Sequence, residues 1–332
     1  MKSYKGIKLP TIKDFSVPIY VDNNKPRRES TNRYFEESFK EANSFLKVGG
    51  LIIDEKLVKF VDCPVCNSKN KKELFVKWGF RISTCIDCNH SFVENQLKSS
   101  VLEKLYATSE IDELFQERSV DKDHMKYMIL FYNKYLQYFS KFINKEGSLL
   151  DVGAGDGKFI EFLDATSSYK LSAMEFSEKS ADFIKNIVGE ENFYNTPITN
   201  SDFKGEMFNI ITILGVLEHM DSPLTELSKC KEILLKDGRI IALVPNFESR
   251  AFKILGINTP TINPRSHLQY YTYNSFEKLA DNAGFEIDAY FQELPVIDLM
   301  YDFISYSEEL LESILKDNES YRSVYILKHK TS

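Results

Sequence analysis

The feature that most limits what this chain can fold into is a glycine-rich stretch at residues 149–159, Leu-Leu-Asp-Val-Gly-Ala-Gly-Asp-Gly-Lys-Phe. A short apolar run ends in Asp151 and Val152, three glycines follow at alternate positions, and an amphipathic run begins at Lys158. Because glycine tolerates a positive φ and has no Cβ, such a turn lets a ligand approach the backbone at the start of the next helix. The stretch therefore predicts a buried strand, a tight turn and a helix that together bind a nucleotide-like ligand.

From this stretch to the end of the chain, apolar runs of strand length alternate with amphipathic runs of helix length. Short connections between them predict the α/β class, with a doubly wound parallel sheet whose ligand binds at the carboxyl ends of the strands. The predicted strands are 148–152, 170–175, 192–195, 208–214, 238–245, 285–291 and 323–328, and the predicted helices are 158–165, 178–188, 223–234, 275–283 and 298–315. A long loop is expected after residue 245.

The residues before the glycine-rich stretch are less regular. Prolines interrupt residues 1–20, which we interpret as an extended arm, and the polar residues 26–30 are interpreted as a linker. Apolar residues at helical spacing predict helices over 31–46, 99–117 and 121–144. A strand-like segment over 51–61 leads into a group of cysteines.

Four of the five cysteines form two Cys-x-x-Cys pairs separated by eighteen residues. The pairs are Cys63 with Cys66 and Cys85 with Cys88. This spacing is typical of a zinc ribbon, in which four thiolates hold a structural zinc ion and leave it no open coordination position. The intervening residues 74–82 alternate like a strand of a β-hairpin, and His90 is a spare ligand candidate. Two separate redox motifs or incidental thiols are the alternatives, whereas disulfides are not expected in a cytoplasmic protein.

Composition and charge narrow the class of protein. The chain has 332 residues, of which 43% are hydrophobic and 27% charged, as in ordinary globular proteins. No apolar run approaches the roughly 20 residues of a membrane span, and no signal peptide is visible, so a cytoplasmic location is expected. Residues 1–90 carry 17 Lys and Arg against 11 Asp and Glu, whereas the remainder carries 25 against 38. The acidic remainder argues against a long nucleic-acid track, and the basic N-terminal part keeps a nucleic-acid partner open.

The acid before the glycines decides between two nucleotide-like ligands. A dinucleotide-binding turn has the spacing G-x-G-x-x-G and rests a pyrophosphate on the helix N-terminus. Here the glycines are Gly153, Gly155 and Gly157, and Asp151 would repel a pyrophosphate but suits a cationic ligand. S-adenosylmethionine (SAM) is such a ligand, because its amine and its sulfonium are both positively charged.

Two later stretches of the sequence support SAM as the ligand. Glu175 closes the second predicted strand, where its carboxylate can accept hydrogen bonds from both ribose hydroxyls, and Phe176 can pack on an adenine ring. The strand at 208–214 runs into an acid–histidine pair, Glu218 and His219.

Together these motifs resemble the class I SAM-dependent methyltransferases over residues 120–330: D-x-G-x-G-x-G, the ribose acid, a Leu-Glu-His segment and Leu-Leu-Lys-Asp-Gly before strand five. The resemblance implies an enzyme with a Rossmann-like sheet of seven strands, the last of them antiparallel. Asn209 departs from the aspartate that the family usually has there. The residues implied to bind SAM are Asp151, Gly153, Ala154, Gly155, Gly157, Glu175, Phe176, Thr196, Pro197, Ile198 and Leu214.

These interpretations divide the chain into four parts. Residues 1–60 form an N-terminal arm and helix, and residues 61–95 form the zinc ribbon. Residues 96–146 form a helical lid or linker, and residues 147–330 form the SAM-binding methyltransferase domain.

A zinc ribbon before such a domain resembles the sugar C-methyltransferases of deoxysugar pathways and related enzymes that tailor polysaccharides or secondary metabolites. Those enzymes carry a Tyr-x-Glu-His-x-x-Tyr segment after strand five. Here His267 and Tyr270 match, whereas Pro264 and Ser266 replace the first tyrosine and the glutamate, and their extra C-terminal domain is not found in the sequence. We therefore expect transfer to a hydroxyl of a small-molecule acceptor, namely a sugar, nucleotide sugar or glycan, with C-methylation as the alternative.

A hydroxyl acceptor has to lose its proton, and a histidine with an ordinary pKa of about 6.5 suits that task. His219 and His267 both follow strand ends on the ligand side of the sheet. We expect His267 to act as the base or to orient the acceptor, with Glu218, His219 and Tyr270 beside it. A purely structural role for His219 is the alternative.

The long loop is also expected to contact the acceptor. It carries Arg250 and Arg265, which suit an acidic acceptor such as a nucleotide-sugar diphosphate. Two other functions stay open. In an rRNA or tRNA methyltransferase the ribbon would bind RNA, although the chain lacks an Asn-Pro-Pro-Tyr-like motif. In a zinc-ribbon interaction protein the methyltransferase fold would be retained without catalysis.

Overall fold

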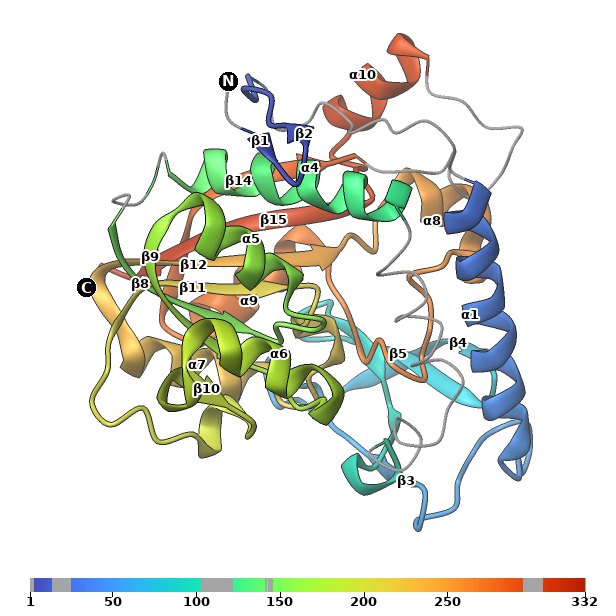
Figure 1. The fold of residues 1–332 in the computed structure, drawn as a ribbon. Coiled ribbons are helices and arrows are strands. Elements are labelled where there is room, and N and C mark those ends of the chain that lie inside the picture. Colours follow the sequence, from blue (N-terminus) through green and yellow to red (C-terminus); the bar gives the residue numbers. More distant parts are fainter. Residues whose placement is uncertain are drawn as a thin grey trace.

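The computed structural model describes residues 3–13, 25–102, 122–140, 142, 146–294 and 307–331. Its centre is a seven-stranded sheet with helices on both faces (Figure 1). Across the sheet the strands run in the order β10, β9, β8, β11, β12, β15, β14. Their bounds are β8 Glu146–Val152, β9 Ser168–Met174, β10 Phe193–Tyr194, β11 Phe208–Leu214, β12 Leu234–Pro245, β14 Phe285–Glu293 and β15 Arg322–His329.

Neighbouring strands in this sheet are parallel except where β15 lies between β12 and β14. The predicted doubly wound sheet of seven strands with an antiparallel last strand is therefore confirmed. After β8 the chain forms β9 on one side of β8, and it later forms β11 on the other side of β8. Ligands of such sheets bind where the winding changes direction, so the carboxyl ends of β8 and β11 define the place to look for a site.

Successive side chains of the central strands enter two hydrophobic cores, one on each face of the sheet. Leu149 and Ile210 pack in the core that includes side chains of α4, α5 and α6, whereas Leu150 and Ile211 pack in the core that includes α7 and α9. Strand residues alternate between faces, so a sheet covered on both faces needs nearly continuous apolar strands. The helices are α4 Lys122–Phe139, α5 Lys158–Thr166, α6 Glu178–Val188, α7 Pro223–Ile233, α9 Tyr273–Asn282 and α10 Glu308–Lys316.

The cysteine region forms a second, antiparallel sheet in the order β13, β6, β5, β4. Its strands are β4 Lys71–Lys77, β5 Phe80–Cys85, β6 Ser91–Val93 and β13 Gln269–Tyr270. The segment 74–82, expected to be one strand, is instead a hairpin that turns at Trp78 and Gly79, where φ is 56° and 91°. Two consecutive residues with positive φ match the twist of a tight hairpin, which is why the turn falls inside the alternating run.

Strand β13 belongs to the part of the chain predicted as the methyltransferase domain, yet it pairs with β6 of the cysteine region. Gln269 lies opposite Phe92, and Tyr270 lies opposite Ser91. The segment after strand five is therefore one edge of the sheet of the cysteine region. A shorter pair, β3 Val58–Phe60 with β7 Asn95–Leu97, completes this region.

The N-terminal hairpin packs on helices that cover one face of the seven-stranded sheet. It consists of β1 Ser3–Tyr4 and β2 Ile7–Lys8, and it lies beside α4 and α5 in Figure 1. The ring of Tyr4 meets that of Phe162 in α5 edge to face, with 5.4 Å between ring centroids. The expected extended arm is thus a covering element in its described part, residues 3–13.

Several expected boundaries are wrong. Residues 26–30 are not a linker but part of α1 (Lys25–Ser44), because a proline in a first helical turn breaks no intrahelical hydrogen bond. The long loop contains α8 (Arg250–Leu255), which starts where the Ser249 side chain accepts a hydrogen bond from the Phe252 backbone N–H. Strand β12 starts at Leu234 rather than at residue 238, and an irregularity in its pairing with β11 keeps Asp237 and Gly238 within the strand.

The helix expected over 121–144 ends at Phe139. The helices expected over 99–117 and 298–315 lie partly outside the described residues, and their described parts, 99–102 and α10, are helical. Four 3-10 turns lie in the loops: η1 Glu190–Asn192, η2 Ile198–Asn200, η3 Leu217–His219 and η4 Gly256–Asn258.

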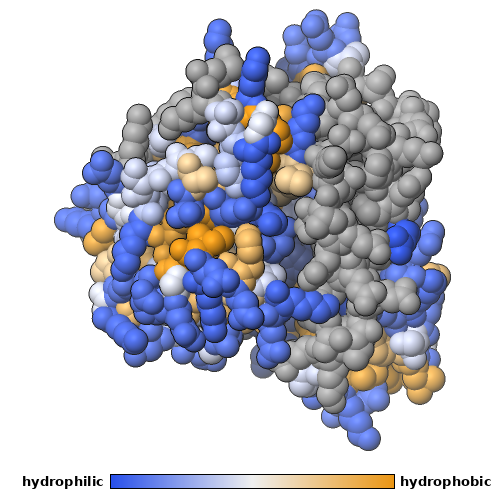
Figure 2. Space-filling model, viewed as in Figure 1, coloured by the Kyte–Doolittle hydropathy of each residue, from blue (hydrophilic) through white to orange (hydrophobic). Residues whose placement is uncertain are grey.

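Among the coloured residues of the face shown in Figure 2, hydrophilic ones predominate, and hydrophobic ones gather in small groups. Within the described ranges, no helix combines the length and the apolar character that crossing a membrane requires.

Candidate functional site

The glycine-rich turn joins β8 to α5 at the carboxyl edge of the sheet. All three of its glycines have positive φ, of 74°, 59° and 74° in chain order. A Cβ on Gly153 would lie 2.5 Å from Cγ2 of Val216, whereas a Cβ on Gly155 would meet nothing within 4 Å. Gly153 is therefore required for close packing under the turn, and Gly155 faces open space.

Asp151 is the last residue but one of β8 and lies directly before this turn. Its side chain is 4% exposed, and its Oδ1 accepts a 2.6 Å hydrogen bond from Oγ1 of Thr212 in β11. Burial raises the pKa of Asp151 to about 7; the Thr212 hydrogen bond opposes this shift and the charge of Glu175 adds to it. A cation bound over the turn would stabilise the ionised carboxylate, as expected for the positively charged end of SAM.

Glu175 follows β9 and turns its carboxylate towards the glycines. Its Oε2 accepts a 2.7 Å hydrogen bond from the N–H of Gly155, and its Oε1 accepts hydrogen bonds of 2.8 Å from the N–H groups of Phe176 and Ser177. The turn is held from below as well, because the N–H groups of Gly153 and Ala154 both donate to the carbonyl of Met174. The structure thus brings the predicted ribose acid and the predicted glycine turn together.

The other residues predicted to bind SAM lie at neighbouring strand ends. Phe176 is 61% exposed, which leaves its ring available to a flat ligand. Thr196 and Pro197 are exposed after β10, whereas Ile198 is buried in the core. Leu214 ends β11 and is half-buried. These positions surround the turn along one edge of the sheet, in the order in which the strands are arranged.

Three of the four predicted catalytic residues also come together. Glu218 and His219 lie on η3, directly after β11, and His267 lies in the segment before β13. One potential ligand atom from each lies within 4.8 Å of the other two, and the two imidazole rings meet edge to face with centroids 4.7 Å apart. Tyr270 is not part of this group, because its side chain is buried in the hydrophobic cluster beneath the ribbon.

Hydrogen bonds define the tautomers of the two histidines. Nδ1 of His219 lies 2.8 Å from the carbonyl oxygen of Ser266, and Nδ1 of His267 lies 2.8 Å from that of Thr261. A carbonyl can only accept, so each Nδ1 carries the proton and each neutral ring keeps a lone pair on Nε2.

The pKa values of all three side chains in this group are shifted from their ordinary values. Desolvation lowers the pKa of His267 to about 3, assisted by the neighbouring His219, and lowers that of His219 to about 4 although part of this side chain is exposed. Burial raises the pKa of Glu218 to about 8, and the charge of Arg322 partly opposes that shift.

The four cysteines of the two pairs converge, as the zinc ribbon requires. Their sulfur atoms all lie within 4.8 Å of one another, and the Sγ atoms of Cys63 and Cys88, like those of Cys66 and Cys85, are 3.5 Å apart. A tetrahedral zinc site with bonds of about 2.3 Å places its sulfur atoms about 3.8 Å apart, so this group fits zinc. His90 points elsewhere: its Nε2 lies 2.9 Å from Oε1 of Gln269.

A short chain of backbone contacts links the ribbon to the histidine group. The N–H of Val93 in β6 donates to the carbonyl of Leu268, and the N–H of Leu268 donates a 2.6 Å hydrogen bond to the carbonyl of Glu218. The Gln269 side chain, held by His90, donates to the carbonyl of Met220. The ribbon therefore fixes both the segment that carries His267 and the turn that carries Glu218.

A family model described as a methyltransferase domain matches residues 124–290. The chain belongs to this methyltransferase family. Its glycine turn, Glu175 and sheet order are those that the class I resemblance implied, and the chain is a SAM-dependent methyltransferase.

Solved structures of other methyltransferases are similar in part. The plantazolicin methyltransferase BpumL in complex with SAH is 15% identical, with 69% of this chain and 93% of that chain covered and a TM-score of 0.48. A Burkholderia thailandensis 1,6-didemethyltoxoflavin-N1-methyltransferase is 15% identical, with 74% and 98% covered and a TM-score of 0.47. A SAM-dependent methyltransferase from Clostridium acetobutylicum is 12% identical, with 70% and 99% covered and a TM-score of 0.44. No curated protein matches the sequence.

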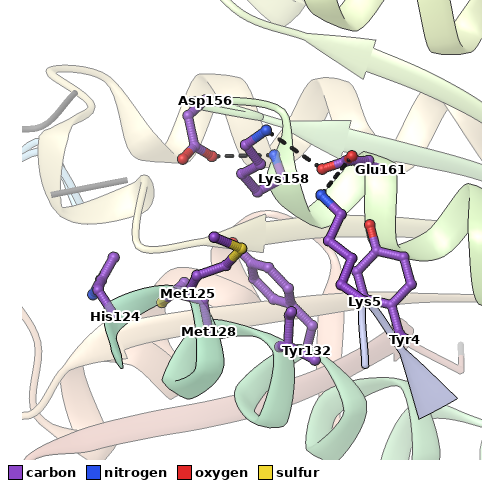
Figure 3. A pocket seen from close by; sticks show the side chains of 10 residues that line it. Tyr4, Lys5, His124, Met125, Met128, Tyr132, Asp156, Lys158 and Glu161 are labelled. Atoms are coloured by element: carbon purple, nitrogen blue, oxygen red, sulfur yellow. Dashed lines mark hydrogen bonds and ion pairs between the residues drawn. The ribbon is translucent and has the colours of Figure 1, made fainter. Parts of the chain in front are cut away.

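The methyltransferase also has a cavity that the sequence analysis missed. About 90 Å³ in volume, it lies between the N-terminal hairpin, α4 and the start of α5 (Figure 3). Its lining residues are Tyr4, Lys5, His124, Met125, Met128, Ile129, Tyr132, Asp156, Lys158 and Glu161. Lys5 and Lys158 both donate to the carboxylate of Glu161. The regular aromatic and methionine spacing in α4 was the available signal, whereas the contribution of Tyr4 and Lys5 depends on a contact distant in sequence.

Both loop arginines of the methyltransferase pair with carboxylates. Arg250 pairs with Asp317 at 3.0 Å and with Glu319, and it holds α8 against the loop before β15. Arg265 is 1% exposed and pairs with Glu41 of α1. The expectation that Arg265 binds an acidic acceptor is therefore wrong, because its side chain is buried against Glu41. For Arg250 the expectation stays a prediction.

Proposed function

We propose that this methyltransferase transfers the methyl group of SAM to a hydroxyl of a small-molecule acceptor, a sugar, nucleotide sugar or glycan. The observation that carries the proposal is the group formed by Glu218, His219 and His267, one side of which adjoins the SAM turn. Val216, two residues before Glu218, is the side chain against which Gly153 packs. An acceptor bound at this group would therefore lie beside the residues proposed to hold SAM.

We assign the cofactor contacts residue by residue. Asp151 and the backbone of Gly153, Ala154, Gly155 and Gly157 hold the methionine part, and Glu175 accepts hydrogen bonds from the ribose. The adenine is placed between Phe176 and the turn Thr196–Pro197–Ile198, and Leu214 closes the methionine end. SAM supplies a methyl group already activated by the positive sulfonium. The chain then has to hold the acceptor in line with it, and such positioning alone can lower a barrier by about 7–11 kcal/mol.

The group of Glu218, His219 and His267 suits a substrate that receives the methyl group on a hydroxyl. Its atoms can accept the hydrogen bond that such a hydroxyl donates. Each histidine presents a lone pair on Nε2, since its Nδ1 donates to a backbone carbonyl. A hydroxyl placed there can direct its hydrogen to the group while its oxygen faces the methyl carbon. His267 is the residue assigned to receive or orient that hydroxyl, with His219 and Glu218 beside it.

We also propose that the four cysteines hold a structural zinc ion and that the ribbon stabilises the acceptor side of the site. The edge of its sheet is occupied by β13, so that edge is not free to bind RNA. None of the five cysteines forms a disulfide, which suits a reducing cytoplasm. Removing zinc is expected to lower the melting temperature and acceptor turnover while SAM still binds. Unchanged turnover in protein shown to be zinc-free would contradict this role.

The test of the main proposal is a screen of the purified chain with SAM against sugars, nucleotide sugars, glycans and RNA. Release of S-adenosylhomocysteine is measured, and NMR of the product locates the new methyl group. We expect turnover with a hydroxyl-bearing small molecule and a methyl group on oxygen. A methyl group on carbon would support the alternative of C-methylation. Turnover with RNA alone, falling steeply with salt, would contradict a small-molecule acceptor.

A further inference from the structure

Glu218, His219 and His267 lie where we propose that the methyl acceptor binds. Each of their side chains has an atom that can accept a hydrogen bond. Glu218 is 4% exposed, and its Oε2 has no hydrogen-bond partner within the part of the chain that the structure describes. His219 and His267 each keep a lone pair on Nε2, because Nδ1 of each donates to a carbonyl. One potential ligand atom from each of the three lies within 4.8 Å of the others.

These groups are stabilised either by a proton on Glu218 or by a positive charge among them. A buried carboxylate that lacks a donor or a counter-ion is costly, and two imidazole lone pairs beside it supply neither. The charge of Arg322 reaches Glu218, but its guanidinium is engaged elsewhere. Its Nε lies 3.4 Å from a carboxylate oxygen of Glu293, and its Nη2 donates to the hydroxyl of Tyr127.

We propose that Glu218, His219 and His267 bind a divalent first-row transition-metal cation and leave its other coordination positions open to the methyl acceptor. Two imidazoles and one carboxylate with open positions suit such ions, whereas an all-oxygen set suits calcium or magnesium. The site is distinct from the cysteine group, in which four thiolates would enclose their ion completely.

The ion's role in methyl transfer rests on the proposed function, whereas its binding does not. With an ion bound, the ion would hold the acceptor hydroxyl in place of a free Nε2 lone pair. A cation makes a coordinated hydroxyl more acidic, as it does a coordinated water. The acceptor oxygen then forms a bond to the methyl carbon, and the carbon–sulfur bond breaks with its electron pair passing to sulfur. S-adenosylhomocysteine is released, and the hydroxyl proton passes to solvent. The atoms and charges balance without an oxidant or reductant.

The backbone supports the site as it would a metal centre. Metal-binding histidines commonly donate their second ring nitrogen to a carbonyl or carboxylate, which fixes the ring. Here the carbonyls of Ser266 and Thr261 fill that place for His219 and His267. The carbonyl of Glu218 is itself fixed by the N–H of Leu268, at 2.6 Å. Both imidazole rings and the backbone of Glu218 are therefore held in place before an ion arrives.

The test is a cobalt(II) titration of the full-length chain whose cysteine group is already loaded with zinc. Cobalt bound to imidazole and carboxylate gives visible absorption without the thiolate charge-transfer band that a cysteine site would add. We expect one cobalt ion per chain beside one zinc ion, measured by elemental analysis after desalting. Loss of a residue that only supports a metal ligand weakens metal binding by roughly 10- to 100-fold. Glu218→Gln and His219→Ala each remove a proposed ligand, so each should weaken cobalt binding by more than that.

The matched control is His329→Gln. His329 lies at the end of β15, where its Nε2 meets the carbonyl of Leu234 at the opposite edge of the sheet. This variant should bind cobalt like the unaltered chain. The proposal is overturned if the unaltered chain binds zinc alone, or if Glu218→Gln and His219→Ala bind cobalt as tightly as the control. Calorimetry with SAM on the same samples shows whether each protein still binds the cofactor. Loss of cobalt binding is thereby distinguished from loss of SAM binding.

Discussion

The backbone N–H of Gly155 donates a 2.7 Å hydrogen bond to Oε2 of Glu175, twenty residues further along the chain. This contact joins the turn after β8 to the end of β9. Because the other carboxylate oxygen accepts from Phe176 and Ser177, Glu175 is held in one orientation. The glycine turn and Glu175 therefore form one preorganised surface, to which we expect SAM to bind.

Substitution of two glycines of the turn should have unequal effects. Gly153→Ala and Gly155→Ala both place a Cβ at a positive φ, which costs about 1–2 kcal/mol. Gly153→Ala should also force its Cβ against Val216, at 2.5 Å, and overpacking of this kind adds about 1–3 kcal/mol. Urea unfolding should therefore show a larger loss for Gly153→Ala.

A double variant checks the cause of that difference. Val216→Ala should restore much of the stability lost in Gly153→Ala and none of that lost in Gly155→Ala. Equal losses for the two alanine variants, unaffected by Val216→Ala, would show that Val216 does not limit this turn.

Binding of SAM should release a proton near neutral pH. Burial raises the pKa of Asp151 from its ordinary value of 3.8 to about 7 in the ligand-free protein, and a nearby positive charge should lower it again. SAM affinity should therefore rise with pH through about 7 and then level off. Calorimetry at one pH in buffers with different ionisation enthalpies measures the released protons, and Asp151→Asn should release fewer.

The same shift has a consequence for stability. A carboxyl whose folded-state pKa lies above its unfolded value binds more protons when folded, so its contribution to stability falls as the pH rises. Stability of the ligand-free protein should lose this contribution between about pH 4 and pH 7. Asp151→Asn should remove that part of the pH dependence, and a variant with the unaltered slope would contradict the shift.

His90 should affect turnover from outside the acceptor group. His90→Leu would leave Oε1 of Gln269 buried without its donor, at a cost of about 1–3 kcal/mol. Because Gln269 also holds the carbonyl of Met220, the variant should lower kcat or raise KM for the acceptor while the SAM affinity stays unchanged. His329→Leu loses one hydrogen bond at the other edge of the sheet and serves as the control for stability alone. Equal turnover of the two variants would show that His90 is purely structural.

Much of the fold could be predicted because local patterns carry it. The seven strands and their helices follow from apolar runs that alternate with amphipathic ones, and the glycine turn and Glu175 mark the edge where they meet. The convergence of His219 with His267 was expected only from their common position after strand ends. Their tautomers, which depend on the carbonyls of Ser266 and Thr261, had no counterpart in the sequence.

The rest depends on contacts between distant segments. Strand β13 has two residues, too few for a period, and its partner β6 lies far earlier in the chain. The buried pair of Arg265 with Glu41 likewise uses two ordinary charged residues whose partners cannot be read locally. For that reason Arg265 was assigned to an acceptor, and the ribbon's place beside the histidines was not foreseen.

The most direct test of the account is calorimetry of S-adenosylhomocysteine with the unaltered chain, Glu175→Ala and the control Glu178→Gln. Glu178 lies in the first turn of α6, close in sequence to Glu175. We expect one ligand per chain for the unaltered protein and the control, and a loss of binding by at least about tenfold, or about 1.4 kcal/mol, for Glu175→Ala. Equal affinity in all three proteins would contradict a cofactor site built on Gly155 and Glu175.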